Sequence, residues 1–225
     1  MILGVQSYSL RNLSYEKALE VISNLGFKYV EAYPRHLEPK AENVGIALNI
    51  HKKFGIKLIS HGVNRMSEKG LKELFDFANS VEIEILTADP DEETLPKIND
   101  LVKEYNIKVA IHNHGPNHRW GSYKKIYEKV ENLDSRIGMC LDLAHLARYG
   151  ENPLEAIEKL GKRILEIHLK DVNENGSDDI IGKGVLNIKD VMKKAKELDI
   201  PIMIEYELDD PVNGIKKSLE FLMSM

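Results

Sequence analysis

Short apolar runs rich in valine, isoleucine and leucine alternate along the chain with longer segments in which apolar residues recur about every three to four positions. The short runs are typical of β-strands buried on both faces, and the longer segments are typical of amphipathic helices. The predicted strands cover residues 2–6, 28–33, 56–61, 81–87, 107–112, 137–142, 164–169 and 200–205. The predicted helices are Tyr15–Leu25, Glu42–Phe54, Glu68–Asn79, Thr94–Tyr105, Tyr123–Leu133, Pro153–Leu160, Ile188–Leu198 and Pro211–Met223.

The ends of several predicted helices carry the residues that helix termini prefer. Serine is favoured as an N-cap, and glycine is favoured just after the last turn. Ser14, Ser67 and Ser122 stand where helices would begin, and Gly26, Gly55 and Gly161 stand where helices would end.

Strand and helix alternate with short links, which favours a parallel sheet because parallel strands need helical crossovers. Eight strand–helix units are the number that closes a barrel filled by side chains. An open doubly wound sheet is the alternative, but no Gly-x-Gly-x-x-Gly follows the first strand. The sequence therefore predicts an α/β protein, with one (β/α)8 TIM-barrel domain over residues 1–225.

Consecutive predicted strands end on residues that can bind a metal, namely His112, Asp142, His168 and Glu205. In a parallel barrel all carboxyl ends of strands open on one face, and side-chain alternation allows these residues to converge there. Two imidazoles and two carboxylates suit a divalent cation such as Mn, Co, Zn, Fe or Mg, with positions left open for substrate oxygens. We therefore expect one bound metal ion.

Composition narrows the setting in which the protein works. The formal net charge of −5 argues against a nucleic-acid partner, which normally leaves a basic face. The single cysteine, Cys140, excludes an internal disulfide, fits a reducing cytoplasm, and is expected to be a small apolar filler. No signal-peptide pattern and no apolar stretch near the roughly 20 residues of a membrane span are present. We expect a cytoplasmic protein without a membrane partner, and a homodimer stays open.

Several short motifs together resemble the xylose isomerase-like barrel superfamily, specifically its sugar phosphate isomerase/epimerase group. The motifs, in chain order, are Gly4–Arg11, Tyr29–Glu31, His112–His114, Asp142–His145, His168–Asp171, Gly182–Gly184 and Ile204–Glu205. The resemblance implies metal ligands at Asp142, His168 and Glu205. At the fifth strand, where the group usually has a glutamate, this chain has His112.

The histidine at position 112 leaves two enzyme activities to consider. In the ketose 3-epimerases the missing glutamate and the last-strand glutamate form a two-sided acid/base pair, which would be incomplete here. The segment His112–His114 is similar instead to the inosose dehydratase branch. The resemblance implies a metal-dependent sugar or sugar phosphate isomerase/epimerase that abstracts a proton next to a carbonyl through an enediolate. The alternative is a dehydratase acting on a keto-inositol or keto sugar.

Candidate roles follow for individual residues. Glu205 is the first choice for a base that also contacts the metal, and His145, His114 and Lys170 are candidates for the second acid/base. His145 could instead orient Asp142, and Lys170 could simply pair with Asp171 or Glu166. By strand parity Glu166 points into the barrel, where a structural pair with Lys108 is expected.

A small sugar or polyol is the expected partner. The candidate substrate-binding residues are Gln6, Glu31, His61, Asn113, Trp120 and Lys183. For Glu31 and His61 an ordinary polar role at the barrel rim is the alternative, Trp120 could be either a sugar-stacking wall or a loop anchor, and Lys183 could bind phosphate or be solvated.

Two rival classes stay open. Apurinic endonucleases of the same superfamily share the Asp-x-x-His pattern, but they also need a histidine after the fourth strand, where this chain has Thr87. A sugar-binding protein without catalysis is the other rival, because the glutamate of the fifth strand is missing.

Overall fold

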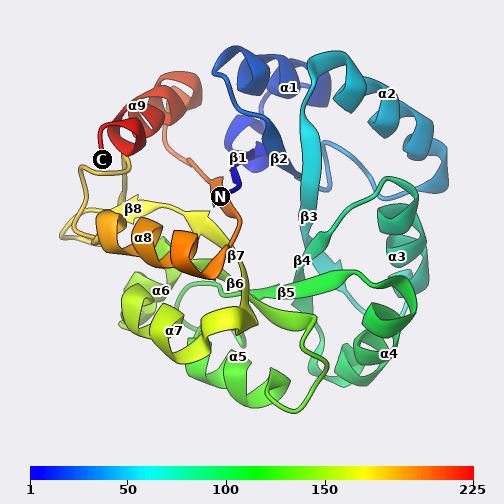
Figure 1. The fold of residues 1–225 in the computed structure, drawn as a ribbon. Helices are drawn as coiled ribbons and strands as arrows, with labels where there is room; N and C mark the ends of the chain where they lie inside the picture. Colours follow the sequence, from blue (N-terminus) through cyan, green and yellow to red (C-terminus); the bar gives the residue numbers. More distant parts are fainter.

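The computed structural model describes all residues from 1 to 225, and it shows eight parallel strands closed into a barrel with helices around it (Figure 1). Around the barrel the strands follow the order β1-β10-β7-β6-β5-β4-β3-β2. Their bounds are β1 Leu3–Gln6, β2 Tyr29–Ala32, β3 Lys57–Met66, β4 Ile85–Pro90, β5 Lys108–His112, β6 Ile137–Asp142, β7 Ile164–Leu169 and β10 Ile202–Ile204. The predicted (β/α)8 TIM barrel is confirmed.

The helices cover the outside of the barrel and bury their apolar sides against the strands. They are α1 Tyr15–Asn24, α2 Val44–Phe54, α3 Leu71–Ser80, α4 Leu95–Tyr105, α5 Tyr123–Val130, α6 Leu143–Tyr149, α7 Pro153–Leu160, α8 Ile188–Leu198 and α9 Pro211–Met223. Short 3-10 turns are η1 Ser7–Leu10, η2 Ala41–Asn43, η3 Glu92–Thr94 and η4 Gly161–Arg163.

Two of the three predicted N-caps are confirmed. The hydroxyls of Ser14 and Ser122 accept hydrogen bonds from backbone N–H groups in the first turns of α1 and α5. The prediction for Ser67 is wrong, because α3 begins only after Gly70, which adopts a left-handed conformation with φ of 79°. The Ser67 hydroxyl bonds instead to the carbonyl oxygen of Lys69.

Three features near the carboxyl ends of the strands differ from the predicted pattern. Strand β3 continues to Met66, beyond the predicted end at residue 61. Helix α6 begins directly at the end of β6, with no intervening loop. After β7, the pairs Asp171–Val172 (β8) and Asp178–Asp179 (β9) form a small antiparallel ribbon. All three features add structure at the face where the predicted site lies.

The apolar core has two layers. A cluster of 55 buried residues lies between the barrel and its helices. A second cluster fills part of the barrel interior and consists of Ile59, Ile85, Ala110, Cys140, Leu165 and Met203. Cys140 therefore lies in an apolar layer, where burial raises the pKa of its thiol, in agreement with its predicted role as a filler.

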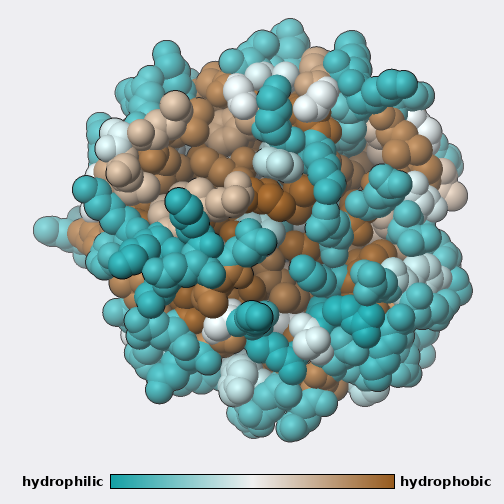
Figure 2. Space-filling model, viewed as in Figure 1, coloured by the Kyte–Doolittle hydropathy of each residue, from teal (hydrophilic) through white to brown (hydrophobic).

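Polar side chains cover most of the perimeter of the face shown in Figure 2, whereas apolar side chains gather near its middle and toward α9. Helix α9 contributes exposed apolar residues such as Met223, which is 79% exposed. None of the helices combines the length and the apolar character that a membrane crossing requires.

Candidate metal centre

The four predicted metal ligands converge at the carboxyl ends of four neighbouring strands. His112 and Asp142 are the last residues of β5 and β6, His168 is near the end of β7, and Glu205 directly follows β10. One ligand atom from each residue lies within 4.8 Å of all the others. The register explains this convergence, since it places His168 beside both Asp142 and Met203 in the sheet.

Several buried donor atoms of these residues form no hydrogen bond, although two of the carboxylate oxygens lie within ion-pair distance of the Lys170 ammonium. The orphaned atoms are both ring nitrogens of His112, Oδ2 of Asp142, Nδ1 of His168 and Oε2 of Glu205. Burying polar groups without partners is costly, so such a cluster calls for a cation or ordered solvent. Two nitrogen and two carboxylate donors match a divalent transition metal. The residues present therefore fit the predicted ion.

Asp142 is held in place by the groups on either side of it. Its Oδ1 accepts the backbone N–H of His145 at 2.7 Å and caps helix α6, which leaves Oδ2 for the centre. The side-chain amide of Asn113 donates to the Asp142 carbonyl at 3.0 Å and accepts the Asp142 N–H at 2.8 Å. Asn113 was predicted to bind substrate, but the structure places its amide against the Asp142 backbone.

His168 reaches a carboxylate with each ring nitrogen. Its Nε2 lies 2.6 Å from Oε2 of Glu31, and its Nδ1 lies 3.0 Å from Oε2 of Glu205. The Thr87 hydroxyl donates a further hydrogen bond to Glu31. Because an ionised carboxylate can only accept, Glu31 fixes the proton on Nε2 and leaves Nδ1 for a metal. Glu31 is fully buried, and it is not among the residues that line the cavity beside the centre.

Opposing effects act on the pKa of His168. Burial acts to lower that pKa, but the charges of the surrounding groups, which include Glu31 and Glu205, outweigh burial and raise it well above its ordinary value. The imidazole is thus held by negative charge on both sides. A metal at Nδ1 would take over the role of that positive charge.

Lys170 is a buried cation within the centre. Its Nζ lies 3.2 Å from Oδ2 of Asp142 and 3.2 Å from Oε2 of Glu205, and it also pairs with Glu207. Burial acts to lower the pKa of Lys170, but these three carboxylates raise it well above its ordinary value. The predicted pairing with Asp171 or Glu166 is wrong, because the Lys170 ammonium pairs with these three carboxylates instead.

Asp171 organises the loop after β7. Its carboxylate accepts the backbone N–H groups of Gly182, Gly184 and Leu186 at 2.9–3.1 Å. A Cβ at Gly184 would lie 2.2 Å from Asp171 Oδ1, so glycine is required there for the close approach. Lys183, predicted to bind substrate, lies exposed in this turn, and it does not line the cavity.

A cavity of about 250 Å³ opens above the centre. Its lining residues come from loops and strand ends around the barrel: Gln6, Tyr8, Tyr33, Gly62, Val63, His112, His114, His145, Glu205 and Glu207. Predicted site residues in the lining include Gln6, His114 and His145. The side chain of Gln6 is already engaged, since it donates to the Gly62 carbonyl and accepts the Tyr8 N–H.

Tyr8, Tyr33 and Glu207 also line the cavity, and none of them is predicted from the sequence. The rings of Tyr8 and Tyr33 pack edge to face with centroids 4.9 Å apart and form an aromatic wall of the cavity. Strand parity could have pointed to two of them, because Tyr33 and Glu207 each follow an inward-facing glutamate by two positions.

Two other predicted substrate-binding residues lie outside the cavity lining. His61 is fully buried, and its Nε2 donates to the Leu37 carbonyl at 2.8 Å. Trp120 is also fully buried, and its indole N–H donates to the Pro90 carbonyl at 2.9 Å. Trp120 therefore anchors the loop after β5 to the end of β4. Of its two roles predicted from the sequence, the structure shows the loop anchor and not the sugar-stacking wall.

Two histidines on the cavity wall were predicted to take part in acid/base chemistry. Burial and neighbouring imidazoles lower the pKa of His114 to about 3, so its ring is neutral at physiological pH. The Nε2 atom of His145 lies 4.0 Å from Oδ2 of Asp142. His145 therefore supports Asp142 through its backbone N–H, while its ring faces the cavity.

Glu166 lies in the barrel interior as strand parity predicted, but its predicted partner does not reach it. Lys108 is exposed at the opposite end of β5, and the Glu166 carboxylate instead lies 3.6 Å from Nε2 of His168. Burial and the nearby Glu31 raise the pKa of Glu166 to about 8. The expected pair between Glu166 and Lys108 is therefore wrong.

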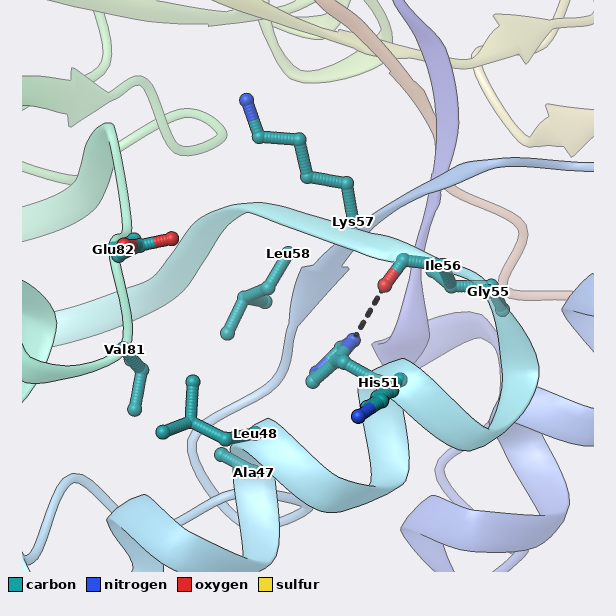
Figure 3. Close-up of a pocket in the computed structure, with 10 residues that line it drawn as sticks. Ala47, Leu48, His51, Gly55, Ile56, Lys57, Leu58, Val81 and Glu82 are labelled. Carbon is teal, nitrogen blue, oxygen red and sulfur yellow. Dashed lines mark hydrogen bonds between the residues drawn. The ribbon is translucent and has the colours of Figure 1, made fainter.

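A separate cavity of about 340 Å³ lies between α2 and the amino end of β3 (Figure 3). Its histidine, His51, bonds to the Ile56 carbonyl at 3.1 Å and to the Tyr15 hydroxyl at 2.8 Å, so both ring nitrogens are occupied. This cavity is away from the carboxyl ends of the strands and offers no free ligating group from that histidine.

Comparisons with known proteins agree with this architecture. The family described as "Xylose isomerase-like TIM barrel" matches residues 19–225. "Uncharacterized protein MJ1311" of Methanocaldococcus jannaschii is 24% identical over 99% of this chain and 88% of its own length. An inosose dehydratase of Clostridium tetani is 31% identical, but over only 36% of this chain and 27% of the dehydratase.

Among solved structures, IolI protein with a bound zinc atom superposes with a TM-score of 0.80 at 18% identity, covering 100% of this chain and 97% of that chain. At this identity the likeness shows the fold alone. The family match covers most of the chain and agrees with the closed barrel and with the order of its motifs. This chain belongs to the xylose isomerase-like TIM barrel family, whose members include sugar isomerases, sugar epimerases and inosose dehydratases.

Proposed function

We propose that the protein is a divalent-metal-dependent sugar isomerase that moves a proton between adjacent carbons of a small keto sugar through an enediolate. The observation that carries the proposal is a four-residue donor set, with buried donor atoms that form no hydrogen bond, at the floor of a cavity that one of its carboxylates also lines. The zinc atom bound in the IolI structure, which shares this fold, supports a bound metal.

His112, Asp142, His168 and Glu205 would hold the ion. When bound, a divalent cation polarises a substrate carbonyl and lowers the pKa of the adjacent C–H. The remaining chemistry belongs to the side chains around it.

Glu205 is the base in this proposal. Burial acts to raise its pKa, but Lys170 and His168 lower that pKa to about 2, so the carboxylate is ionised at physiological pH. It lines the cavity and can accept a proton from a carbon held above it. The Lys170 ammonium, 3.2 Å away, would stabilise the negative charge that develops on the enediolate.

The single carboxylate base favours transfer on one face of the substrate. Glu205 can return the proton to the neighbouring carbon on the same face, and a hydroxyl proton passes between the two enediolate oxygens, which together interconvert a ketose and an aldose. Epimerisation needs a donor on the opposite face, where this chain has imidazoles. His114, with its pKa lowered to about 3, carries no proton to give as a cation. Isomerisation is therefore better supported than epimerisation.

A dehydratase is the second candidate, and the same observation favours it. After taking the proton from carbon, Glu205 could pass it to a β-hydroxyl on the same face, which leaves as water and gives an unsaturated carbonyl product. The partial match to inosose dehydratases supports this alternative. Thr87 donates its hydroxyl to Glu31, so strand β4 supplies no nitrogen ligand of the kind expected for an apurinic endonuclease.

Proton NMR in deuterated water tests the proposal. Zinc- or magnesium-loaded protein is incubated with ketoses, their phosphates and keto-inositols, and the metal is removed before spectra are recorded. We expect deuterium beside a carbonyl, with an aldose product for isomerisation or an enone for dehydration.

The Asp142→Asn variant is the control, because its remaining oxygen can still cap α6 while one charged ligand is lost. It should retain the fold and lose exchange by two orders of magnitude or more (about 10²-fold). No exchange by the metal-loaded protein over the whole panel would favour a sugar-binding protein and would contradict the proposal.

A further inference from the structure

A second group of ligating side chains lies beside the first centre and shares none of its residues. Asp89 comes from β4, and His114 and His118 come from the loop after β5. One ligand atom from each of the three lies within 4.8 Å of the other two. His114 also lines the cavity above the first centre, and its ring centroid is 4.7 Å from that of His112. The group therefore borders the same cavity.

The two imidazoles of this group present free nitrogens. The backbone N–H of Trp120 donates to Nδ1 of His118 at 3.2 Å, which leaves Nε2 as the available nitrogen of that ring. That Nε2 lies 3.8 Å from Oδ1 of Asp89, which is too far for a hydrogen bond. Nε2 of His114 is buried and has no hydrogen-bond partner. The two rings lie close together, with centroids 4.1 Å apart, and no hydrogen bond joins them.

The loop that carries the histidines is fixed to the end of β4. His114 N–H donates to the Trp120 carbonyl at 3.1 Å, and the Trp120 indole donates to the Pro90 carbonyl at 2.9 Å. The Arg119 guanidinium bonds to both Pro90 and Asp89. The three ligating groups are therefore held near one another by bonds that do not use their free nitrogens.

The charge around Asp89 is balanced without a metal. Arg65 and Arg119 each lie near both Asp89 and Asp91, so two cations face two carboxylates. Arg119 bonds to Oδ1 of Asp89 at 2.6 Å, and a carboxylate has lone pairs enough to bind an ion as well.

We infer that Asp89, His114 and His118 form a second divalent transition-metal site at the rim of the cavity. Two imidazole nitrogens and one carboxylate oxygen suit zinc or cobalt, and three protein ligands leave a coordination position open. Because His114 lines the cavity, that position would be available to a substrate oxygen or to water. The second site does not depend on which reaction the first centre performs.

Counting bound metal tests the second site directly. Metal-free, full-length protein is dialysed to equilibrium against zinc and then against cobalt, and the bound ions per chain are measured by plasma mass spectrometry. We expect two ions in the wild type and one in His118→Asn. Asparagine retains an oxygen that can accept the Trp120 N–H and lacks the nitrogen that faces Asp89, so the loop should keep its structure.

Matched variants separate the two sites. Asp91 pairs with the same two arginines as Asp89 but is not one of the three ligating residues, so Asp91→Asn should still bind two ions. Asp89→Asn should bind only one. Asp142→Asn should lose only the ion of the first centre. The second site would be overturned if His118→Asn still binds two ions. It would also be overturned if the wild type binds one ion and His118→Asn retains it. If the wild type binds one ion and only Asp142→Asn loses it, the second site is likewise overturned. That result would still support a metal at the first centre.

Discussion

The ring of His168 lies between two buried carboxylates, and only one of them belongs to the predicted donor set. Glu31 accepts the Nε2 proton and so determines which nitrogen is free to bind a metal. We expect Glu31→Gln to weaken zinc affinity about tenfold or more, since the amide is uncharged and can also present its N–H to the ring. Competition with a chromophoric chelator measures the affinity, and circular dichroism verifies the fold. An unchanged dissociation constant would show that Glu31 does not orient His168.

The raised pKa of Glu166 makes the free energy of unfolding depend on pH. Its pKa is raised to about 8 from 4.5, so the folded protein holds a proton that the unfolded chain releases between these values. Stability from this group is therefore fully present below about pH 4.5 and falls as pH rises through about 8. In metal-free protein, Glu166→Gln should reduce the loss of unfolding free energy between about pH 5 and about pH 9 by at least ~1 kcal/mol. Urea denaturation at both pH values measures it, and identical pH dependence in the two proteins would contradict it.

The position of Glu166 also marks what strand parity can and cannot predict. Parity correctly pointed its side chain into the barrel. The depth of the Glu166 side chain along the barrel axis depends on how neighbouring strands are staggered. In the sheet Glu166 pairs with Cys140, and Cys140 pairs with His112. Glu166 thus lies near the metal layer rather than at the level of Lys108. Strand stagger is a property of barrel closure, and no local pattern in one strand encodes it.

Helix α6 and the metal centre share one residue. Asp142 caps the helix with Oδ1 and offers Oδ2 to the centre. In metal-free protein we expect Asp142→Ala to be less stable than Asp142→Asn by about 1 kcal/mol, because only asparagine can keep the cap. Both variants lose the charge that faces Lys170, so the difference isolates the cap. Equal urea midpoints and slopes for the two variants would assign the cap no measurable contribution.

The loop after β7 is a second element whose order depends on one carboxylate. Asp171→Asn replaces one acceptor oxygen with an N–H group, which would face backbone N–H donors of Gly182 and Gly184 if it took the position of Oδ2. We expect destabilisation of about 1–3 kcal/mol, and faster amide hydrogen exchange concentrated at residues 182–186. Exchange that rises equally throughout the barrel, or stays unchanged in this loop, would argue against a local anchor.

Helices and strands could be predicted where the pattern of apolar residues was long enough to show its period. Shorter elements could not be predicted in this way. Helix α6 has seven residues and follows β6 without a turn residue, so its apolar positions merge with those of the strand. The aromatic pair of Tyr8 and Tyr33 was not predicted, because Tyr8 lies in the short turn η1 and Tyr33 follows β2, so no single periodic pattern contains both. By contrast, the four ligands were found because strand ends and topology together bring them to one face.

At the scale of the whole molecule, the metal would join strands β5, β6, β7 and β10, which span half of the barrel. A ligand that binds only the folded state raises stability, by about 2.7 kcal/mol at a free concentration of 100 times its dissociation constant. We expect zinc to raise the midpoint of thermal unfolding of metal-free protein by roughly 5–10 °C and a chelator to reverse the change. Calorimetry measures the shift. The same midpoint with and without metal would contradict a centre formed by the folded barrel.

Trp120 is the chain's one tryptophan, and it anchors the loop that bears His114 and His118. Its indole is fully buried and lies against the end of β4, so its fluorescence reports on a single known environment. Selective excitation of this indole would follow events at the cavity rim without any added label. The intrinsic emission of the unmodified protein thus provides a direct optical signal for titrating ions and sugars.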